Sequence, residues 1–365
     1  MIPASLYLAA LAVFPAGPAA SSELRLNHVQ VIGTHNSYHV APTSALMAAF
    51  RGVAAEWQYS HRPLDEQLGQ LGVRQFELDV FADPEGGHLS NPVGAGFSTP
   101  PHAEEMRAPG FKVLHVQDID YVSTCPTFVE CLAAVRAWSD AHPRHLPVLI
   151  LIEAKDSAID DPLNLGFATP VPYSPELFLK LESEIESVFP RERIITPDDV
   201  RGRRRTLARA IAKDGWPLLE ECRGKVMFAL DNPGRPKQLY LEARPKLKKA
   251  LLFVDSKPGD DYAAFAKRND PVGAADEIRD LVERGFLVRT RADAGLKEGR
   301  EGDTARRDVA FATGAHFVST DFPEVREELS DAYVVALPGG VVARLNPVSA
   351  PSEDVDPDEL SEDGE

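Results

Sequence analysis

Histidine, asparagine and acidic side chains stand at the ends of several apolar segments of this chain. His35 and Asn36 follow the apolar run that ends in Gly33, in V-I-G-T-H-N-S-Y-H. Later segments carry Glu77 and Asp79 in V-R-Q-F-E-L-D-V-F, His115 in F-K-V-L-H-V-Q-D and Glu153 in L-P-V-L-I-L-I-E-A-K-D. A histidine exchanges protons near neutral pH, and amide and carboxylate oxygens bind hard cations. The pattern therefore predicts a site that combines proton transfer with a bound cation.

The carboxylates provide the argument for a cation. Glu77 and Asp79 are two residues apart in an expected strand, so their side chains point to the same face. Two carboxylates this close repel each other unless positive charge lies between them. An oxygen-only set that suits calcium or magnesium and disfavours zinc is formed by Asn36, Glu77, Asp79 and Glu153. The spacing leaves one alternative open, in which ordinary salt bridges neutralise the carboxylates, from Arg74, Lys112 or Lys155.

His35 and His115 are the candidate catalytic histidines. Two imidazoles that face one substrate form an acid–base pair, in which one removes a proton from an attacking hydroxyl and the other protonates the leaving oxygen. Four further histidines are not part of this pattern with the candidate oxygen ligands and are interpreted as surface or loop residues: His39, His61, His88 and His102. The absence of G-x-S-x-G, Walker-type, dinucleotide-binding and H-E-x-x-H motifs excludes the commonest esterases, kinases, dehydrogenases and metalloproteases.

These residues need a scaffold of strands and helices to position them. Eight apolar segments, without clean alternation, predict buried parallel strands over residues 28–34, 73–81, 111–116, 147–153, 225–230, 250–254, 286–291 and 316–320. Helical periodicity lies between several of them, over residues 127–141, 175–188, 276–283 and 304–313. This alternation predicts an α/β fold, a (β/α)8 TIM-type barrel that forms a single catalytic domain over residues 24–335.

A doubly wound open sheet is the alternative fold. The barrel is favoured because polar residues come late in several expected strands, as ligand binding at one rim would require: Asp231, Asp255, Arg289, Arg291, Asp293 and Asp321. Residues 82–110 form a long loop rich in glycine and proline, and loops of this length are often lids or binding loops.

The composition limits the partners and the compartment. A formal net charge of −17 argues against binding to nucleic acid and against electrostatic attachment to anionic membranes. Residues 1–20 are apolar and uncharged and resemble a secretory signal, and Pro15 and Pro18, which break the apolar run, argue against a transmembrane anchor. Residues 350–365 are predicted to form an acidic disordered tail.

Three cysteines are present. Cys125 and Cys131 flank an expected helix start and could close a small disulfide loop in an exported protein, although their spacing also allows two unpaired cysteines on one helix. Cys222 is then expected to be a free, buried thiol.

Taken together, these residues resemble the catalytic barrel of the calcium-dependent phosphoinositide-specific phospholipases C, in particular their secreted, single-domain bacterial form. The resemblance covers most of residues 25–325. The matching elements are G-T-H-N-S-Y at 33–38, E-L-D at 77–79, His115, A-W-S-D-A-H-P at 137–143, I-L-I-E-A-K at 150–155 and V-R-T-R-A-D at 288–293.

The resemblance implies a role for each matching residue. His35 would act as general base or stabilise the phosphorane, and His115 would assist as acid. The Ca²⁺ ligands would be Asn36, Glu77, Asp79 and Glu153. The inositol 2-hydroxyl would attack the phosphodiester, release diacylglycerol and form a 1,2-cyclic phosphate that water then opens. Lys225 and Arg289 would be contacts for the headgroup.

The resemblance also implies the setting of the enzyme. The substrate would be phosphatidylinositol in membranes, reached by transient interfacial contact, and the protein would be a secreted monomer, extracellular or periplasmic. A glycerophosphodiester phosphodiesterase is the nearest rival, but those enzymes usually begin H-R-G where this chain has H-N-S. A catalytically silent secreted barrel that binds calcium or inositol lipid is the other alternative.

Overall fold

The computed structural model describes residues 24–50, 54–161, 164–326, 333–351 and 357–362. The signal-like segment over residues 1–20 lies outside the described residues.

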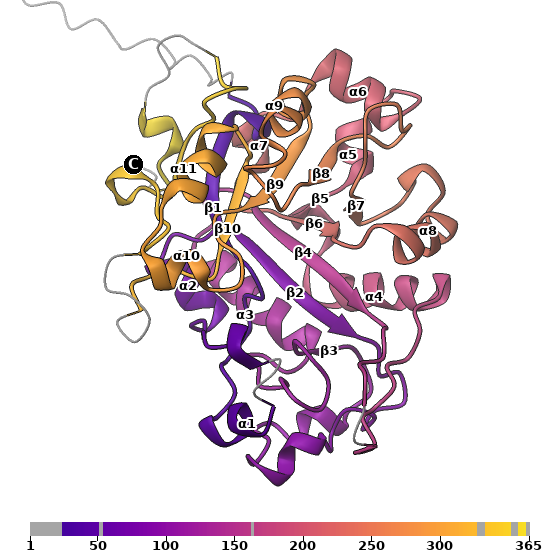
Figure 1. The fold of residues 1–365 in the computed structure, drawn as a ribbon. Coiled ribbons are helices and arrows are strands. Elements are labelled where there is room, and N and C mark those ends of the chain that lie inside the picture. Colours follow the sequence, from indigo (N-terminus) through magenta and orange to yellow (C-terminus); the bar gives the residue numbers. More distant parts are fainter. Residues whose placement is uncertain (1–23, 51–53, 162–163, 327–332, 352–356, 363–365) are drawn as a thin grey trace, which may run out of the picture.

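A ring of parallel strands forms the centre of the molecule (Figure 1). Eight parallel strands of the described chain make up this ring, namely β1 (Val29–Thr34), β2 (Gln75–Phe81), β4 (Val148–Lys155), β6 (Val226–Leu230), β7 (Leu252–Val254), β8 (Phe265–Lys267), β9 (Leu287–Arg291) and β10 (Phe317–Thr320). They pair in the order β1-β2-β4-β6-β7, and on the other side β1-β10-β9-β8. The ring closes where Asp255, after β7, forms a parallel bridge with Phe265 of β8. The predicted α/β barrel is confirmed.

Seven of the predicted strands are ring strands among the described residues, and one prediction is wrong. Residues 111–116 hold only β3 (Lys112–Val113), which runs antiparallel to β2 and lies outside the ring. The missing ring strand is β8, whose F-A-K sequence is too short to show a strand pattern. Two other short strands flank the ring: β5 (Ile194–Ile195) beside β6, and β11 (Ala343–Leu345), antiparallel to β1.

Helices lie outside the strands (Figure 1). They are α1 (Ser44–Ala49), α2 (Leu64–Gln70), α3 (Phe128–Ala141), α4 (Pro175–Val188), α5 (Pro197–Arg201), α6 (Leu207–Asp214), α7 (Leu219–Cys222), α8 (Gly234–Ala243), α9 (Ala275–Glu283), α10 (Lys297–Glu301) and α11 (Ala305–Ala312). The four helices expected from periodicity correspond to α3, α4, α9 and α11. Short 3₁₀ helices include η3 (Val93–Gly96) and η8 (Pro357–Leu360). None of the described helices is long and apolar enough to cross a bilayer.

Capping residues define where the predicted helices begin. Thr127 accepts a hydrogen bond from the backbone N–H of Glu130, and the Glu130 carboxylate accepts one from the backbone N–H of Thr127. The Ser174 side chain caps α4 by accepting a hydrogen bond from the backbone N–H of Leu177, with Pro175 at the first helical position. Cys125 and Cys131 form a disulfide at the start of α3, and Cys222 is a free, buried cysteine, so both cysteine predictions are confirmed.

The acidic end of the chain is not a free tail over residues 357–362. Glu362 accepts hydrogen bonds of 2.7 Å from Arg74 Nε and from the backbone N–H of Leu146. Arg74 is only 2% exposed and its guanidinium lies over the Trp138 ring. Disorder over all of residues 350–365 is therefore a wrong prediction for this part, because the buried Arg74 provides a counter-charge that composition does not reveal.

The Glu362→Gln variant tests this contact. Burial raises the pKa of Glu362, but the hydrogen bond and charge of Arg74 outweigh it and hold the pKa below its ordinary value. The ionised carboxylate therefore stabilises the fold above the pKa of the unfolded carboxyl, and this stabilisation is lost as the pH falls. We expect Glu362→Gln to lower the free energy of unfolding by about 2 kcal/mol at neutral pH. The difference should shrink as the pH falls below the ordinary glutamate pKa of about 4.3 and vanish only below the lowered pKa of the folded state.

Urea unfolding at several pH values measures this effect. The control is Glu242→Gln, which removes an exposed carboxylate that is paired with Arg235 at 3.6 Å. Equal stability of Glu362→Gln and the native chain at neutral pH would contradict the assignment.

Candidate active site

Three carboxylates meet at the carboxyl ends of β2 and β4. Asp79 pairs in register with Glu153 on the neighbouring strand, and Glu77 lies one step back on the same face as Asp79. One carboxylate oxygen from each of Glu77, Asp79 and Glu153 lies within 4.8 Å of the other two. Glu77 and Asp79 are 3% and 1% exposed. Two adjacent strands thus place three acidic groups in one small, mostly buried volume.

Basic side chains neutralise these carboxylates in part. Arg289 of β9 forms an ion pair with Glu77. Lys155 Nζ lies 3.2 Å from Asp79 Oδ2 and 3.5 Å from Glu153 Oε1. Asp79 Oδ1 is buried and has no hydrogen-bond partner in the described part of the chain.

Two other basic residues considered from the sequence are bound elsewhere. Arg74 contacts Glu362, and Lys112 lies 3.8 Å from Asp83. Of the three basic residues that spacing suggested, only Lys155 contacts the carboxylates.

The remaining negative charge is evident from the pKa values. Burial, together with the charge of Glu77, raises the pKa of Asp79 to about 6 despite Lys155. Burial and the charge of Asp79 raise the pKa of Glu153 to about 7. Burial also opposes ionisation of Glu77, but Arg289 holds its pKa below the ordinary value. The three carboxylates are not fully neutralised by Arg289 and Lys155. Their oxygen atoms therefore suit a divalent cation that prefers oxygen ligands.

Asn36 follows the end of β1, the strand that pairs with β2. It is 1% exposed and has a positive φ of 44°. The next residue, Ser37, donates its backbone N–H to the Glu77 carbonyl at 2.9 Å, which fixes this turn against β2. The Asn36 side-chain nitrogen donates to the Tyr59 hydroxyl at 3.0 Å. Its amide oxygen is therefore the atom that suits a cation.

His35 is held by a carboxylate and an arginine. Its Nδ1 lies 2.8 Å from Asp321 Oδ1, and its Nε2 lies 3.2 Å from Arg291 Nη1 and 4.0 Å from Glu77 Oε1. Arginine can only donate, so Nε2 accepts from Arg291, and Nδ1 carries the proton that is donated to Asp321. Burial and the Arg291 charge lower the pKa of His35. His35 is thus a neutral imidazole with its basic nitrogen directed toward the carboxylates.

His115 has a matching carboxylate. Its Nδ1 lies 2.7 Å from Asp120 Oδ2, and His39 Nε2 lies 2.9 Å from the same oxygen. The other nitrogen of His39 donates to the Tyr59 carbonyl at 2.9 Å. The Tyr59 ring centroid lies 4.4 Å from that of His39 and 6.5 Å from that of His35. Tyr59 therefore links the surroundings of the two candidate catalytic histidines.

Comparison with known proteins gives the family. The family model described as "Phosphoinositide phospholipase C, Ca2+-dependent" matches residues 24–347. The chain belongs to this family. No curated protein matches the chain. The predicted family and enzyme class, a phosphoinositide phospholipase C, are confirmed.

Solved phospholipase C structures share the fold. A calcium-dependent phosphoinositol-specific phospholipase C from Pseudomonas sp in apo form has 17% identity and a TM-score of 0.54, with 90% of this chain and 97% of that chain covered. A Ca²⁺-dependent phosphatidylinositol-specific phospholipase C from Streptomyces antibioticus has 19% identity and a TM-score of 0.52, with 82% and 95% covered. Both support the TIM-type barrel.

Of the two residues expected to contact the headgroup of this phospholipase C, Lys225 lies away from the site and Arg289 lies within it. Lys225 precedes β6, and its carbonyl accepts a hydrogen bond from Val148, the first residue of β4. It therefore lies at the amino end of the barrel, opposite the carboxylates. Arg289 does reach the site, but it is 0% exposed and paired with Glu77. The predicted strand over residues 225–230 already placed Lys225 at its amino end, whereas spacing gave no indication that Arg289 pairs with Glu77.

Two of the four histidines interpreted as surface or loop residues are in fact buried. His39 is 0% exposed and contacts Asp120, and His61 Nε2 donates to the His35 carbonyl at 2.9 Å. Burial lowers the pKa of His61 to about 3. His88 and His102 are exposed, as expected.

Four partners of the candidate catalytic residues had no role assigned from the sequence: His39, Asp120, Arg291 and Asp321. The sequence did indicate Arg291 and Asp321 as residues of the rim, because both are polar residues at predicted strand ends.

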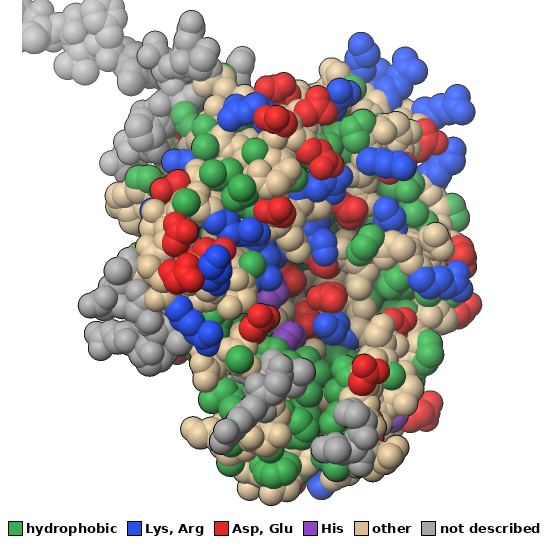
Figure 2. Space-filling model, in the orientation of Figure 1, with side chains coloured by type: hydrophobic (Ala, Val, Ile, Leu, Met, Phe, Trp, Pro, Cys, Tyr) green, Lys and Arg blue, Asp and Glu red, His purple; other side chains and the backbone are tan. Residues whose placement is uncertain are grey.

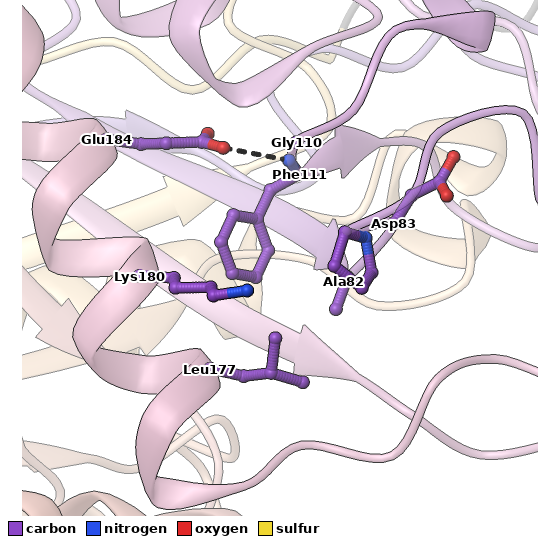
Figure 3. A pocket seen from close by; sticks show the side chains of 8 residues that line it. Ala82, Asp83, Gly110, Phe111, Leu177, Lys180 and Glu184 are labelled. Atoms are coloured by element: carbon purple, nitrogen blue, oxygen red, sulfur yellow. Dashed lines mark hydrogen bonds between the residues drawn. The ribbon is translucent and has the colours of Figure 1, made fainter.

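A small cavity lies apart from this site (Figure 3). It measures about 100 Å³ and lies between the residues that follow β2 and helix α4. Glu184 of α4 accepts the backbone N–H of Phe111 at 3.1 Å across it, as the dashed line in Figure 3 shows. None of the candidate catalytic or metal-binding residues lines it, so we assign it no part in catalysis.

Asp120 contacts His115 Nδ1, and a role in positioning that imidazole can be tested. Asp120→Asn removes the negative charge that fixes the Nδ1 proton of His115. We expect kcat on phosphatidylinositol to fall on the order of 10²-fold or more with little change in KM, because an amide supports the wrong imidazole tautomer. The pH profile of kcat should shift as well.

Steady-state kinetics between pH 5 and 9 measures both effects. Asp160→Asn, an exposed aspartate, is the control. Unchanged kcat in a folded Asp120→Asn protein would exclude the positioning role.

Proposed function

We propose that this chain is a calcium-dependent phosphodiesterase that cleaves phosphatidylinositol to diacylglycerol and inositol phosphate through a 1,2-cyclic phosphate. The observation that carries the proposal is a constellation at one rim of the barrel. His35 and His115 each direct Nδ1 to a carboxylate, Asp321 and Asp120, and Glu77 Oε1 of the carboxylate group lies 4.0 Å from His35 Nε2.

Calcium would be held by oxygen atoms of four residues: Asn36, Glu77, Asp79 and Glu153. The fit rests on the buried, unpartnered Asp79 Oδ1 and on the raised pKa values of Asp79 and Glu153, which reflect insufficient positive charge. When bound, the ion would stabilise negative charge on the phosphoryl oxygens and lower the pKa of a coordinated hydroxyl.

His35 acts as the general base in the proposed first step. Its unprotonated Nε2 takes the proton of the inositol 2-hydroxyl as that oxygen bonds to phosphorus. Asp321 stabilises the imidazolium that forms, through the 2.8 Å contact with Nδ1. Attack within one molecule has a high effective molarity, which favours a cyclic product over direct attack by water.

His115 acts as the general acid. The bond from phosphorus to the diacylglycerol oxygen breaks, and His115 gives its proton to that oxygen. In the second step the two residues exchange roles: His115 takes a proton from water, the water oxygen bonds to phosphorus, and His35 protonates the released 2-oxygen. The protein ends each cycle with its original protonation.

The headgroup we propose is inositol without further phosphates. Several basic side chains near the rim are already paired with carboxylates. Lys267 contacts Asp231, and Arg268 lies 3.1 Å from Asp255. Additional phosphates would have to compete with these ion pairs, whereas an unphosphorylated ring would not.

Secretion is also part of the proposal. A disulfide between Cys125 and Cys131 is typical of an oxidising compartment, extracellular or periplasmic. The signal-like residues 1–20 support the same assignment.

The histidine pair can be tested by substitution. We expect His35→Ala and His115→Ala each to reduce turnover of phosphatidylinositol by at least about 10³-fold, because each removes a proton-transfer group. The thermal midpoint should show that both variants remain folded. His88→Ala, an exposed histidine, should retain activity. Near-native turnover in either histidine variant would overturn the assigned roles.

The calcium ligands can be tested by binding. Removal of Ca²⁺ with a chelator should stop turnover reversibly, and Asp79→Asn should weaken Ca²⁺ affinity about tenfold or more in calorimetry, since one anionic ligand is lost. Asp83→Asn is the control, because Asp83 is also buried and follows the same strand but faces Lys112. Full turnover in chelator would contradict the proposal.

A further inference from the structure

His39, His115 and Asp120 form a second cluster of possible metal ligands, separate from the three carboxylates of the proposed calcium site. One ligand atom from each residue lies within 4.8 Å of the other two. His39 Nε2 lies 2.9 Å and His115 Nδ1 lies 2.7 Å from Asp120 Oδ2. His39 and Asp120 are buried, whereas the His115 side chain is 19% exposed. The cluster therefore has two buried members and one that solvent reaches.

The contacts of His39 require more positive charge than a neutral imidazole has. Its Nδ1 lies 2.9 Å from the Tyr59 carbonyl oxygen, which can only accept, so Nδ1 carries a proton. In a neutral imidazole, Nε2 then has only a lone pair, yet it lies 3.1 Å and 2.9 Å from the two oxygens of Asp120. Burial opposes ionisation of Asp120, but its contacts with the two histidines hold its pKa below the ordinary value. A lone pair and a carboxylate repel each other, so this contact needs a cation between them.

The tautomer of His39 is the one that a metal ligand uses. A histidine that binds a metal through one ring nitrogen usually donates the other N–H to a carboxylate or a backbone carbonyl, as His39 does to Tyr59. Zinc binds its four ligand atoms at about 2.0–2.2 Å in a tetrahedron, which places them about 3.4 Å apart. The two ring nitrogens lie 2.7–3.1 Å from the Asp120 oxygens, so small side-chain movements would admit the ion.

Backbone contacts hold the ligands in position. His39 forms an antiparallel bridge with Ser123, and Asp120 forms one with Val116. The backbone N–H of His61 donates to the His39 carbonyl at 2.8 Å. The ligand set is therefore assembled by the fold before any ion binds, which favours a specific site over casual binding.

The exposed side of His115 gives an ion a route to the cluster. Figure 2 shows histidine side chains, in purple, within a hollow of the surface where acidic and basic side chains also gather. Among the described residues, the cluster offers three ligand atoms. A water molecule that enters from this side would complete a four-coordinate site.

We propose that His39, His115 and Asp120 form a zinc site whose occupation inhibits the enzyme. Two imidazole nitrogens and one carboxylate oxygen suit Zn²⁺, whereas the oxygen-only set of the proposed calcium site suits a harder cation. The two ions therefore bind at different places, and zinc does not need to displace calcium.

Inhibition follows from the proton that zinc replaces. Zn²⁺ bound to His115 Nδ1 displaces the proton that this nitrogen donates to Asp120, and the proton leaves to solvent. The Asp120 carboxylate becomes a zinc ligand and no longer stabilises an imidazolium at His115. His115 then cannot alternate between imidazole and imidazolium, as the proposed general acid must. This inhibitory effect rests on the proposed function, whereas the zinc site itself does not.

Calorimetric titration with zinc chloride tests the site directly, on the full chain saturated with Ca²⁺. We expect one Zn²⁺ to bind per chain with release of protons, measured in buffers of different ionisation enthalpy. His39→Gln should weaken zinc affinity at least about 100-fold, because loss of a ligand costs more than loss of an outer hydrogen-bond partner. His115→Ala should weaken it as much, and this variant changes a partly exposed residue rather than a buried one. The matched control is His88→Gln, which replaces an exposed histidine.

Turnover of phosphatidylinositol at saturating Ca²⁺ measures the inhibition. Zinc at a concentration that fills the site should slow the native enzyme at least about tenfold, because the general acid is lost. Each variant is compared with its own rate without zinc. His88→Gln should be inhibited like the native chain, and the rate of His39→Gln should change less than about twofold at the same zinc concentration.

The outcomes separate the zinc site from catalysis. Absence of zinc binding overturns the proposal, because a second proton on His39 would then supply the missing charge. Native zinc affinity in His39→Gln and His115→Ala, or an equal loss in His88→Gln, overturns it as well. A loss of zinc affinity in Asp79→Asn would place the ion among the calcium ligands and contradict a separate site. Zinc that binds without slowing an active enzyme contradicts the inhibition. If the protein cleaves no inositol lipid, the proposed function fails while calorimetry still decides the zinc site.

Discussion

The organisation of this barrel depends on electrostatic repulsion among buried carboxylates at one rim. Parallel register places Asp79 beside Glu153, with Glu77 on the same face, and burial makes their mutual repulsion expensive. Arg289 and Lys155 relieve part of it. A structure that only needed stability would place apolar residues here, because burying charges rarely gains stability. The negative charge that remains on the carboxylates therefore favours binding of an additional cation. The proposed calcium site depends on this charge.

A second constraint is the orientation of two imidazoles. In each of His35 and His115, a carboxylate contacts Nδ1, which leaves Nε2 as the nitrogen for the proposed proton transfers. The two histidine–carboxylate contacts join residues at very different separations along the chain. Asp120 is five residues from His115, whereas Asp321 is 286 positions from His35 and follows β10, the strand that pairs with β1. The geometry of the proposed catalytic pair therefore depends on pairing between strands distant in the sequence as well as on local turns.

The sequence predicted most of the scaffold because the features involved are local. Apolar runs and capping residues define seven ring strands and the helices α3, α4, α9 and α11, and strand position selected the three carboxylates and His35 as candidates. His115 was selected from a predicted strand that is not part of the ring. The failures concern contacts that are distant in the chain or elements that are very short. β8 has three residues, Arg289 pairs with Glu77 from 212 positions away, and Glu362 finds Arg74 from 288 positions away. Periodicity contains no information on which strand ends face each other.

The account predicts one intermediate above all others. Phosphorus NMR of the products formed from phosphatidylinositol vesicles in the presence of Ca²⁺ tests it most directly, because only attack by the ring hydroxyl gives a five-membered cyclic ester. We predict that inositol 1,2-cyclic phosphate appears first and is then converted to inositol 1-phosphate, and that neither forms when Ca²⁺ is removed. Direct release of inositol 1-phosphate with no cyclic ester, or cleavage that continues without Ca²⁺, would contradict the account.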